Sequence, residues 1–418
     1  MGLAINEHNH APNETHETDI QEQIIQEQLQ ADLQATLQQQ IALTNPPLPQ
    51  QDQPTEPPDG IATEGAVGIF DAQTTNTSSV YAPFEVADGV FVNGRIGVHW
   101  DASSTSTPMP NDAVTEGIRQ AQELGAGYAV VLVDVNNYQA QDQLLEALRE
   151  AGITPVVRLY TPVTPDQWDQ NLIDQMSAAA AHLANNVGIE LIQVGNEPNI
   201  EGAHRVDIND PESRNRYFET SIENQAWAVE AVNDAVAGTN AVIGIPPMAG
   251  GATYFNDDTF GVYSAQEYFV ALVEEIASRE EPGEQLVGWI PTHTYSWPDN
   301  ESTDPDPNCG CARGHMGYGP EVSEDYEAMA AEILGYDPTA LSTEGGPSPD
   351  AIRAENPEAA AAAMNEALIQ VQLDEGLTQA LWLSWETNPG SNAWDNFALY
   401  GDDGFYGPGL DLYRDAAP

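Results

Sequence analysis

The sequence contains no lysine: all eleven of its basic residues are arginine, against 66 aspartate and glutamate residues. The formal net charge of the 418-residue chain is therefore −55 at pH 7. Such a chain repels nucleic acids and anionic membranes, so we expect neither as a partner. An acidic surface with little lysine suits high salt, although drift in base composition can also remove lysine.

Long hydrophobic runs are also missing. No apolar run reaches the roughly 18 residues of a transmembrane helix, and the N-terminus lacks the basic segment and apolar core of a secretory signal. We therefore expect the protein either to stay inside the cell or to leave it by a route or precursor that the sequence does not show. Hydrophobic residues still make up 41% of the chain, which is enough for a substantial core.

Cysteine is scarce. The two cysteines, Cys309 and Cys311, are separated by a single residue. This spacing would strain a disulfide between them and leaves a metal site incomplete, although His315 is near. The pair is interpreted as loop thiols or a strained disulfide in preference to a zinc site.

The first 60 residues differ in composition from the rest. Residues 1–18 are polar and are expected to be disordered. The spacing of their histidines matches no metal motif. Residues 19–44 are glutamine-rich with apolar residues at a helical period, which predicts an amphipathic helix. Residues 45–60 form a proline-rich spacer. We therefore divide the chain into a tail and linker, 1–60, and a folded domain, 61–418.

Apolar strands and helical patterns alternate regularly through the folded domain. A hairpin with a turn at Asn93-Gly94 is predicted first. Eight strand-like segments follow, and helical patterns separate each from the next. They cover residues 95–101, 128–134, 153–160, 190–198, 241–249, 286–297, 340–346 and 379–386.

This alternation predicts an α/β fold with parallel strands. Eight such units close into a (β/α)₈ TIM barrel, here preceded by the disordered or helical tail. An open doubly wound sheet is the competing architecture, but no glycine-rich phosphate loop follows the first strand. The eighth helix is expected to be short or displaced, because only a weak helical pattern around residues 410–416 follows the last strand.

Two glutamates stand where apolar strands end. Asn196 and Glu197 close the fourth strand ahead of Pro198, and Glu344 follows a short apolar run ahead of two glycines. Active-site residues of such barrels lie at the C-terminal ends of strands. Hydrolysis of a glycosidic bond needs a proton donor and a second carboxylate on the other side of the anomeric carbon. The pair therefore predicts glycoside chemistry.

The surroundings of the two glutamates suggest different roles. Glu197 has apolar neighbours in sequence, which suits the acid/base role. Glu344 suits the nucleophile, and Tyr295 or Arg158 nearby would keep it ionised. Arg158 could equally pair with acidic neighbours such as Asp134.

Other strand ends carry the aromatic, amide and imidazole side chains that bind sugars. His99 and His293 are interpreted as supporting hydrogen-bond partners. Trp100 is favoured as a platform for a sugar ring over ordinary packing. The candidate substrate-binding residues are Asn196, His293, Tyr295, Trp385, Trp100, His99 and Arg158.

With these residues, the chain from about residue 90 to 390 resembles the retaining (β/α)₈ glycoside hydrolases of clan A, which include many cellulases, mannanases and xylosidases. The sharpest match is Asn196-Glu197-Pro198 at the fourth strand together with Glu344 at the seventh. The resemblance implies that Glu197 is the acid/base and Glu344 the nucleophile. It also implies that Asn196 binds the hydroxyl next to the anomeric carbon.

Further matches are His293 with Tyr295 on the sixth strand and a tryptophan on the eighth, Trp385 rather than Trp382. One departure is the arginine, which this group commonly has on the second strand and which here is Arg158 on the third. The weak eighth helix is another. Both departures bear on the subfamily more than on the clan.

The sequence thus predicts a retaining glycosidase that acts on a β-linked poly- or oligosaccharide without a cofactor. No metal is expected, because no His-x-His pair follows the first strand. Two alternatives remain: a non-catalytic carbohydrate-binding or adhesin-like barrel, and a structural component that assembles through its tail. The sugar, the linkage, endo or exo action and the oligomeric state stay open.

Overall fold

The computed structural model describes residues 80–100, 107–201, 206, 210–249, 264–296, 320–347, 367–368, 370–384, 398–401 and 404–405. The chain divides into two units, Met1–Gln73 and Thr74–Pro418, and all described residues belong to the second. The predicted tail, the two cysteines and the weak final helix lie outside the described residues.

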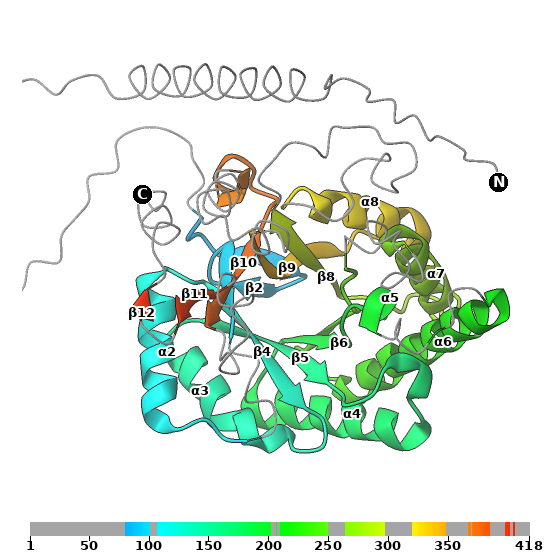
Figure 1. Cartoon of the computed structure of the whole chain (residues 1–418), viewed down its shortest axis with the longest axis horizontal. Coiled ribbons are helices and arrows are strands. Elements are labelled where there is room, and N and C mark those ends of the chain that lie inside the picture. The colour runs from blue at the N-terminus through cyan, green and yellow to red at the C-terminus, as the bar shows by residue number, and fades with distance from the viewer. Residues whose placement is uncertain are drawn as a thin grey trace, which may run out of the picture. The chain divides into compact units, whose positions relative to one another are not determined.

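Eight parallel strands form a nearly closed barrel, as the sequence predicts (Figure 1). From β3 to β9 each strand pairs with the next in the chain, and β10 pairs with β3, so one seam, between β9 and β10, has no strand pairing in the described barrel. In chain order they are β3 (Ile96–His99), β4 (Tyr128–Asp134), β5 (Thr154–Tyr160), β6 (Leu191–Val194), β7 (Val242–Gly244), β8 (Trp289–Ser296), β9 (Thr339–Pro347) and β10 (Gln379–Ser384). The TIM-barrel fold class is therefore confirmed.

The seam between β9 and β10 is joined by side chains. The backbone N–H of Ser342 donates to Oγ1 of Thr378 at 2.8 Å, and that of Ala380 donates to Oγ of Ser342 at 2.9 Å. Two short strands, β11 (Ala398–Gly401) and β12 (Gly404–Phe405), extend the sheet from β10. Short hydroxyl side chains thus replace a backbone ladder where the ring closes.

Helices surround the barrel (Figure 1). The longer ones are α2 (Asn111–Glu123), α3 (Asp142–Glu150), α4 (Gln170–His182), α6 (Pro211–Val236), α7 (Ala265–Ala277) and α8 (Val322–Leu334), and the short ones are η2 (Tyr138–Gln141), η3 (Pro165–Gln167), η4 (Leu183–Val187) and α5 (Pro198–Glu201). Their starts follow local chemistry: Ser264 and Glu267 form a reciprocal capping box at α7. Within the described part of the chain, none of the helices has the length and apolar composition of a membrane span.

The predicted hairpin turn was wrong. The antiparallel hairpin consists of β1 (Phe84–Ala87) and β2 (Val90–Val92), and it turns at Asp88-Gly89, where Gly89 has φ +76°. Asn93-Gly94 instead leads from β2 into the barrel. A Cβ on Gly127 would lie 2.2 Å from the nitrogen of Gly94, so the two glycines let these backbones touch. The conformation of Asn93-Gly94 therefore depends on a contact with Gly127, which is distant in sequence. The local preference of Asn-Gly for hairpin turns cannot predict such a contact.

The core has two layers. One lies between the strands and the helices, and the other fills the barrel. Valines of the hairpin (Val86, Val90 and Val92) belong to the inner layer with residues near the N-terminal ends of the strands, such as Tyr128, Leu191 and Trp289. The hairpin therefore closes the N-terminal end of the barrel, and polar side chains are left to line the other end.

Two glycines make room for the largest rings inside the barrel. A Cβ on Gly97 would lie 2.2 Å from the Tyr128 ring, and one on Gly244 would lie 2.5 Å from the Trp289 ring. Both rings are fully buried. Small residues on β3 and β7 therefore complement large ones on β4 and β8, as close packing requires.

We expect Gly97→Ala or Gly244→Ala to lower the free energy of unfolding by about 1–3 kcal/mol, because the new methyl group overpacks a full interior. The measurement is urea unfolding followed by tryptophan fluorescence. Gly376→Ala is the control, since a Cβ there meets only one side-chain oxygen, at 3.4 Å. An unchanged midpoint in both barrel variants would contradict this account of the inner layer.

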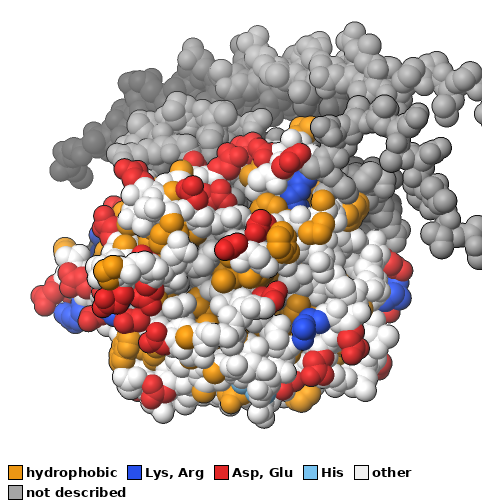
Figure 2. Space-filling model, turned by 180° about the vertical axis from the view of Figure 1, so that it is seen from behind, with side chains coloured by type: hydrophobic (Ala, Val, Ile, Leu, Met, Phe, Trp, Pro, Cys, Tyr) orange, Lys and Arg blue, Asp and Glu red, His pale blue; other side chains and the backbone are white. Residues whose placement is uncertain are grey.

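The described surface carries much acidic charge. Figure 2 shows acidic side chains scattered over one face, with few basic ones among them. Several of the basic ones already have acidic partners: Arg119, for example, contacts both Glu116 and Glu123 on α2. Exposed pairs of this kind contribute little to stability.

Candidate active site

Glu197 lies at the C-terminal end of β6 on a strained turn. Gly195 has φ 81°, and Glu197 has φ 27°, which makes it the one non-glycine residue with a positive φ in the described ranges. A non-glycine residue in this region costs on the order of 1–3 kcal/mol and persists only where its surroundings hold it. Such strain is typical of functional positions.

The residues that follow hold this turn in place. The side chain of Asn199 is buried and forms two hydrogen bonds with the backbone of Ala249: Nδ2 donates to the carbonyl at 2.9 Å, and Oδ1 accepts from the N–H at 3.0 Å. The hydroxyl of Tyr217 on α6 donates to the carbonyl of Pro198 at 2.8 Å. Bonds from two other parts of the barrel therefore fix the position of Glu197.

A bulge in β9 turns the side chain of Glu344 toward the interior of the barrel. Thr292 of β8 pairs with Ser342, but the next residue, His293, pairs with Glu344. Thr343 is thus an extra residue on β9, and such a bulge re-aims the side chain beside it. Glu344 is only 7% exposed.

Arg158 and Tyr295, the two neighbours expected for Glu344, both contact it. Nη1 of Arg158 donates to Oε1 of Glu344, and the hydroxyl of Tyr295 donates to Oε2 at 2.9 Å. Burial raises the pKa of Glu344, but the positive charge of Arg158 and the hydrogen bond that it donates lower the pKa, and the net pKa lies well below its ordinary value. Glu344 is therefore an ionised carboxylate at neutral pH.

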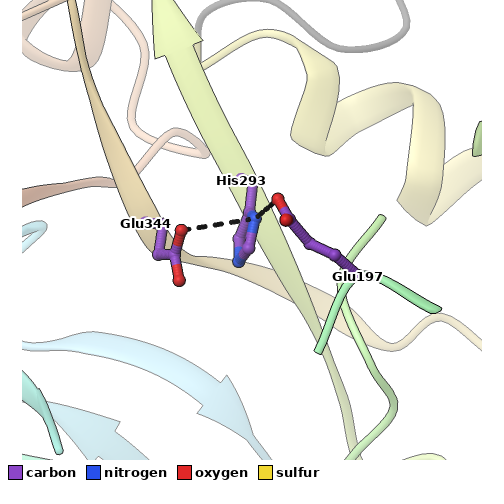
Figure 3. A group of neighbouring side chains, drawn as sticks. All are labelled: Glu197, His293 and Glu344. Carbon is purple, nitrogen blue, oxygen red and sulfur yellow. Dashed lines mark hydrogen bonds and ion pairs between the residues drawn. The ribbon is translucent and has the colours of Figure 1, made fainter. Parts of the chain in front are cut away.

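His293 links Glu344 to Glu197 (Figure 3). Nη2 of Arg158 lies 3.2 Å from Nε2 of His293, and a guanidinium can only donate, so Nε2 accepts. The ring hydrogen is then on Nδ1, which donates to Oε1 of Glu197 at 2.6 Å and lies 3.6 Å from Oε2 of Glu344. Glu197 thus has a polar partner in space although its neighbours in sequence are apolar.

Three of these residues could in principle bind a metal ion. Glu197, His293 and Glu344 each offer one ligand atom, all within 4.8 Å of one another. The hydrogen on Nδ1 of His293 and the positive charge of Arg158 against Glu344 both oppose a cation there. The arrangement favours hydrogen bonding within the group over metal binding.

Solved structures with a similar fold include several glycosidases. The β-glycosidase BGL167 has 15% identity and a TM-score of 0.47 over 73% of this chain and 85% of that one. A broad-specificity endoglucanase from Clostridium acetobutylicum has 14% identity and a TM-score of 0.47 over 78% and 97%. The Old Yellow Enzyme from Pichia sp. has 12% identity and a TM-score of 0.36 over 64% and 82%.

No protein-family model matches the sequence, and no curated protein sequence matches it. These structural similarities have low identity and TM-scores below 0.5. The activity therefore has to be argued from the residues of the site.

The structure brings together most of the predicted site residues. His99, Arg158, Glu197, His293, Tyr295 and Glu344 form one connected group at the C-terminal end of the barrel. Asn196 lies beside this group and donates from Nδ2 to Oε1 of Glu201 at 2.9 Å. Trp385 lies outside the described residues, as does the side chain of Trp382.

Trp100 corrects one expectation. Its side chain is 3% exposed and packs in the layer between strands and helices, where its ring leaves no room for a Cβ on Gly117 of α2. Its Nε1 lies 3.1 Å from the sulfur of Met109. Trp100 is therefore a core residue, and it cannot serve as a platform for a sugar ring.

The sequence analysis missed Glu201 and Tyr217, which helps to hold the turn at Glu197. Glu201 stands four positions after Glu197, a spacing that brings side chains together on a helix. That spacing was a usable signal for Glu201. Tyr217 acts from α6, and nothing in the local sequence marks it.

His99 is buried in the neutral form. Its Nδ1 lies 2.7 Å from the carbonyl oxygen of Trp100, and its Nε2 lies 3.7 Å from Oε1 of Glu344. Burial, and next the charge of Arg158, lower the pKa of His99 to about 3. The unfolded chain binds a proton at this position below about pH 6.5, whereas the folded chain does not.

Acid should therefore remove stability through His99. A lowered histidine pKa means that the free energy of unfolding falls as pH falls below 6.5. The lowered pKa of Glu344 reduces the free energy of unfolding only below about pH 4.5. The raised pKa of Glu201 instead increases the free energy of unfolding as the pH falls. We therefore expect the difference in unfolding free energy between the native chain and His99→Asn to shrink by about 2 kcal/mol from pH 6.5 to 4.5.

Urea unfolding of both proteins at a series of pH values measures this difference. Asparagine suits the test because its amide can keep the hydrogen bond to the carbonyl of Trp100 without a titrating group. A difference that stays constant across this pH range would show that His99 does not titrate as described.

Proposed function

We propose that the protein is a retaining glycoside hydrolase that cleaves β-linked poly- or oligosaccharides through two glutamates. The observation that carries the proposal is the close approach of the two carboxylates, which have oxygens within 4.8 Å of each other across His293. Retaining enzymes hold their two carboxyl groups about 5–5.5 Å apart, whereas inverting enzymes keep them about 6.5–9.5 Å apart to admit a water molecule.

Glu344 has the properties of the nucleophile. Arg158 and Tyr295 each donate to one of its oxygens, and its pKa is lowered. An ionised carboxylate can attack the anomeric carbon and form a glycosyl-enzyme intermediate. Arg158 and Tyr295 also keep the carboxylate in one orientation.

Glu197 takes the acid/base role in this proposal. His293 donates to Oε1, which leaves Oε2 to carry the proton for the departing oxygen. After the leaving group departs, the same carboxylate removes a proton from the attacking water. The strained backbone at Glu197 supports this role, since such strain concentrates at functional positions.

The proposal also assigns residues to substrate binding. Asn196, Tyr295 and Trp385 would bind sugar hydroxyls and ring faces, with His99 and His293 as supporting partners. The β-linkage follows from the resemblance of Asn196-Glu197-Pro198 and Glu344 to clan A. No cofactor takes part in the proposed reaction.

The test is reducing-sugar release from β-linked glucans, mannans, xylans and galactans, followed by NMR of the first-formed anomer. We expect release with retained configuration. Glu197→Ala should lose most of the activity on substrates with poor leaving groups, and azide should restore part of it by attacking the glycosyl-enzyme in place of activated water. Inverted product would disprove the double-displacement mechanism. Binding without release on every sugar would favour a carbohydrate-binding barrel.

A further inference from the structure

One side of the Asn196 amide is held by Glu201. Nδ2 of Asn196 donates to Oε1 of Glu201 at 2.9 Å. Oδ1 of Asn196 is buried and has no hydrogen-bond partner among the described residues. A buried carbonyl without a partner costs free energy, so a donor should reach this oxygen in the working protein.

The chemistry of Glu201 determines which way the amide faces. An ionised carboxylate only accepts hydrogen bonds, so the NH₂ group of Asn196 must point toward it. The carbonyl oxygen is then the group that Asn196 offers to a ligand. A sugar hydroxyl can donate to this oxygen, whereas a fluorine or a hydrogen at the same carbon cannot.

We propose that Glu201 is a positioning residue that orients Asn196 to accept a hydrogen bond from one hydroxyl of the substrate. The pair then sets specificity, because the sugar must carry a hydrogen-bond donor at that carbon. This inference rests on the proposed glycosidase function for its substrate, but the Glu201–Asn196 contact itself does not.

The state of Glu201 should change near neutral pH. Burial raises the pKa of Glu201 to about 7; the bond from Asn196 opposes the rise, as does Arg158, whereas the charges of Glu197 and Glu344 add to it. Below this pH the protonated carboxyl can donate to the amide oxygen, and the amide can turn over. Asn196 then loses its role as acceptor toward the substrate.

The first experiment uses aryl β-glycosides of the sugar that the chain hydrolyses, each with one hydroxyl replaced by hydrogen or by fluorine. At pH 8 we expect one position where both replacements lower kcat/KM by on the order of tenfold relative to the parent. This penalty should shrink at pH 6. It should be independent of pH in Glu201→Gln, and at pH 8 the same replacements should cost less in Glu201→Ala than in the native chain.

Glu150→Gln is the matched control, because it removes an exposed carboxylate at the end of α3 that leads into the N-terminal end of β5, whereas the site lies at the C-terminal ends of the strands. It should reproduce the native pattern at both pH values. If Glu201→Ala keeps the native pattern of penalties, the positioning role is wrong even though the chain is a glycosidase.

The second experiment does not need activity. In protein labelled with ¹⁵N at asparagine, the side-chain NH₂ signals of Asn196 are assigned by their absence in Asn196→Ser. We expect these signals to titrate with a midpoint near pH 7 in the native chain and to lose this transition in Glu201→Gln. Signals that do not titrate, or that titrate equally in Glu201→Gln, would overturn the proposal. If no glycoside is hydrolysed, the proposed function fails, and this titration still decides the role of Glu201.

Discussion

Glu344→Gln is expected to lower kcat for glycoside hydrolysis by on the order of 10⁵-fold, the scale on which loss of a catalytic nucleophile acts. The carbonyl oxygen of glutamine can still accept from Arg158, and its NH₂ group can donate to the hydroxyl oxygen of Tyr295, so the site should keep its shape. It cannot form the glycosyl-enzyme intermediate, because a neutral amide is a poor nucleophile. Steady-state kinetics on the best substrate of the panel, with an aryl glycoside as a second substrate, measures the loss.

Two controls separate lost chemistry from lost structure. Glu332→Gln on α8 also removes an exposed carboxylate and should retain full activity. Calorimetry should show that Glu344→Gln still binds an oligosaccharide of the preferred sugar. Residual activity within tenfold of the native value would mean that another group attacks the sugar, and the proposed mechanism would be wrong.

Arg158→Met should damage both stability and catalysis. Arg158 is 3% exposed, and its removal leaves the buried carboxylate of Glu344 without its cationic partner. Breaking a buried ion pair in this way costs about 3–5 kcal/mol. We also expect kcat to fall by on the order of 10²- to 10³-fold, as it does when a preorganised donor is lost from an active site.

The pH dependence of Arg158→Met should change in a defined direction. Burial is the largest influence on Glu344, and without the guanidinium it should raise the pKa of this carboxyl. The nucleophile must be ionised, so the acidic limb of kcat/KM should move to higher pH. A profile of kcat/KM against pH for both proteins measures the shift.

A double-mutant cycle tests whether the stability loss comes from the stranded charge. Arg158→Met combined with Glu344→Gln should be more stable than Arg158→Met alone, because no buried carboxylate then lacks a partner. Arg119→Met on α2 is the control, since its ion pairs are exposed and should contribute little to stability. A double mutant as unstable as the sum of the single variants would contradict the ion-pair explanation.

Much of the barrel could be predicted because it depends on local periodicity. Strands such as β4 and β5 are apolar on both faces, and helical patterns lie between them, which is enough to order the units. The approach of Glu197 to Glu344 then follows from topology, since all parallel strands end at the same rim. No knowledge of side-chain contacts is needed for that step.

The misplacement of Trp100 was avoidable in principle. Ile96 and Val98 face the helices, and strand alternation assigns Trp100 to the same side, whereas His99 faces the barrel. Counting alternate positions from the apolar residues would have separated the two.

Other features depend on partners distant in sequence. The hydrogen on Nδ1 of His293 follows from Arg158, which lies 135 positions earlier in the chain. The bulge at Thr343 depends on how β9 pairs with β8. Local sequence therefore identified the chemical groups of the site, but it could not reveal their orientations or protonation states.

Because of the bulge, the direction of the Glu344 side chain depends on the number of residues that precede it in β9. Leu341 belongs to the inner core, and Glu344 also faces the interior although it lies three positions later, an odd step that simple alternation forbids. The number of residues between Leu341 and Glu344 therefore determines where the carboxylate points, whatever the identity of those residues. Loss of one residue there would keep every functional side chain in the sequence and yet turn Glu344 toward the helices. Comparison of related chains should accordingly treat a one-residue gap between Leu341 and Glu344 as equivalent to loss of the glutamate itself.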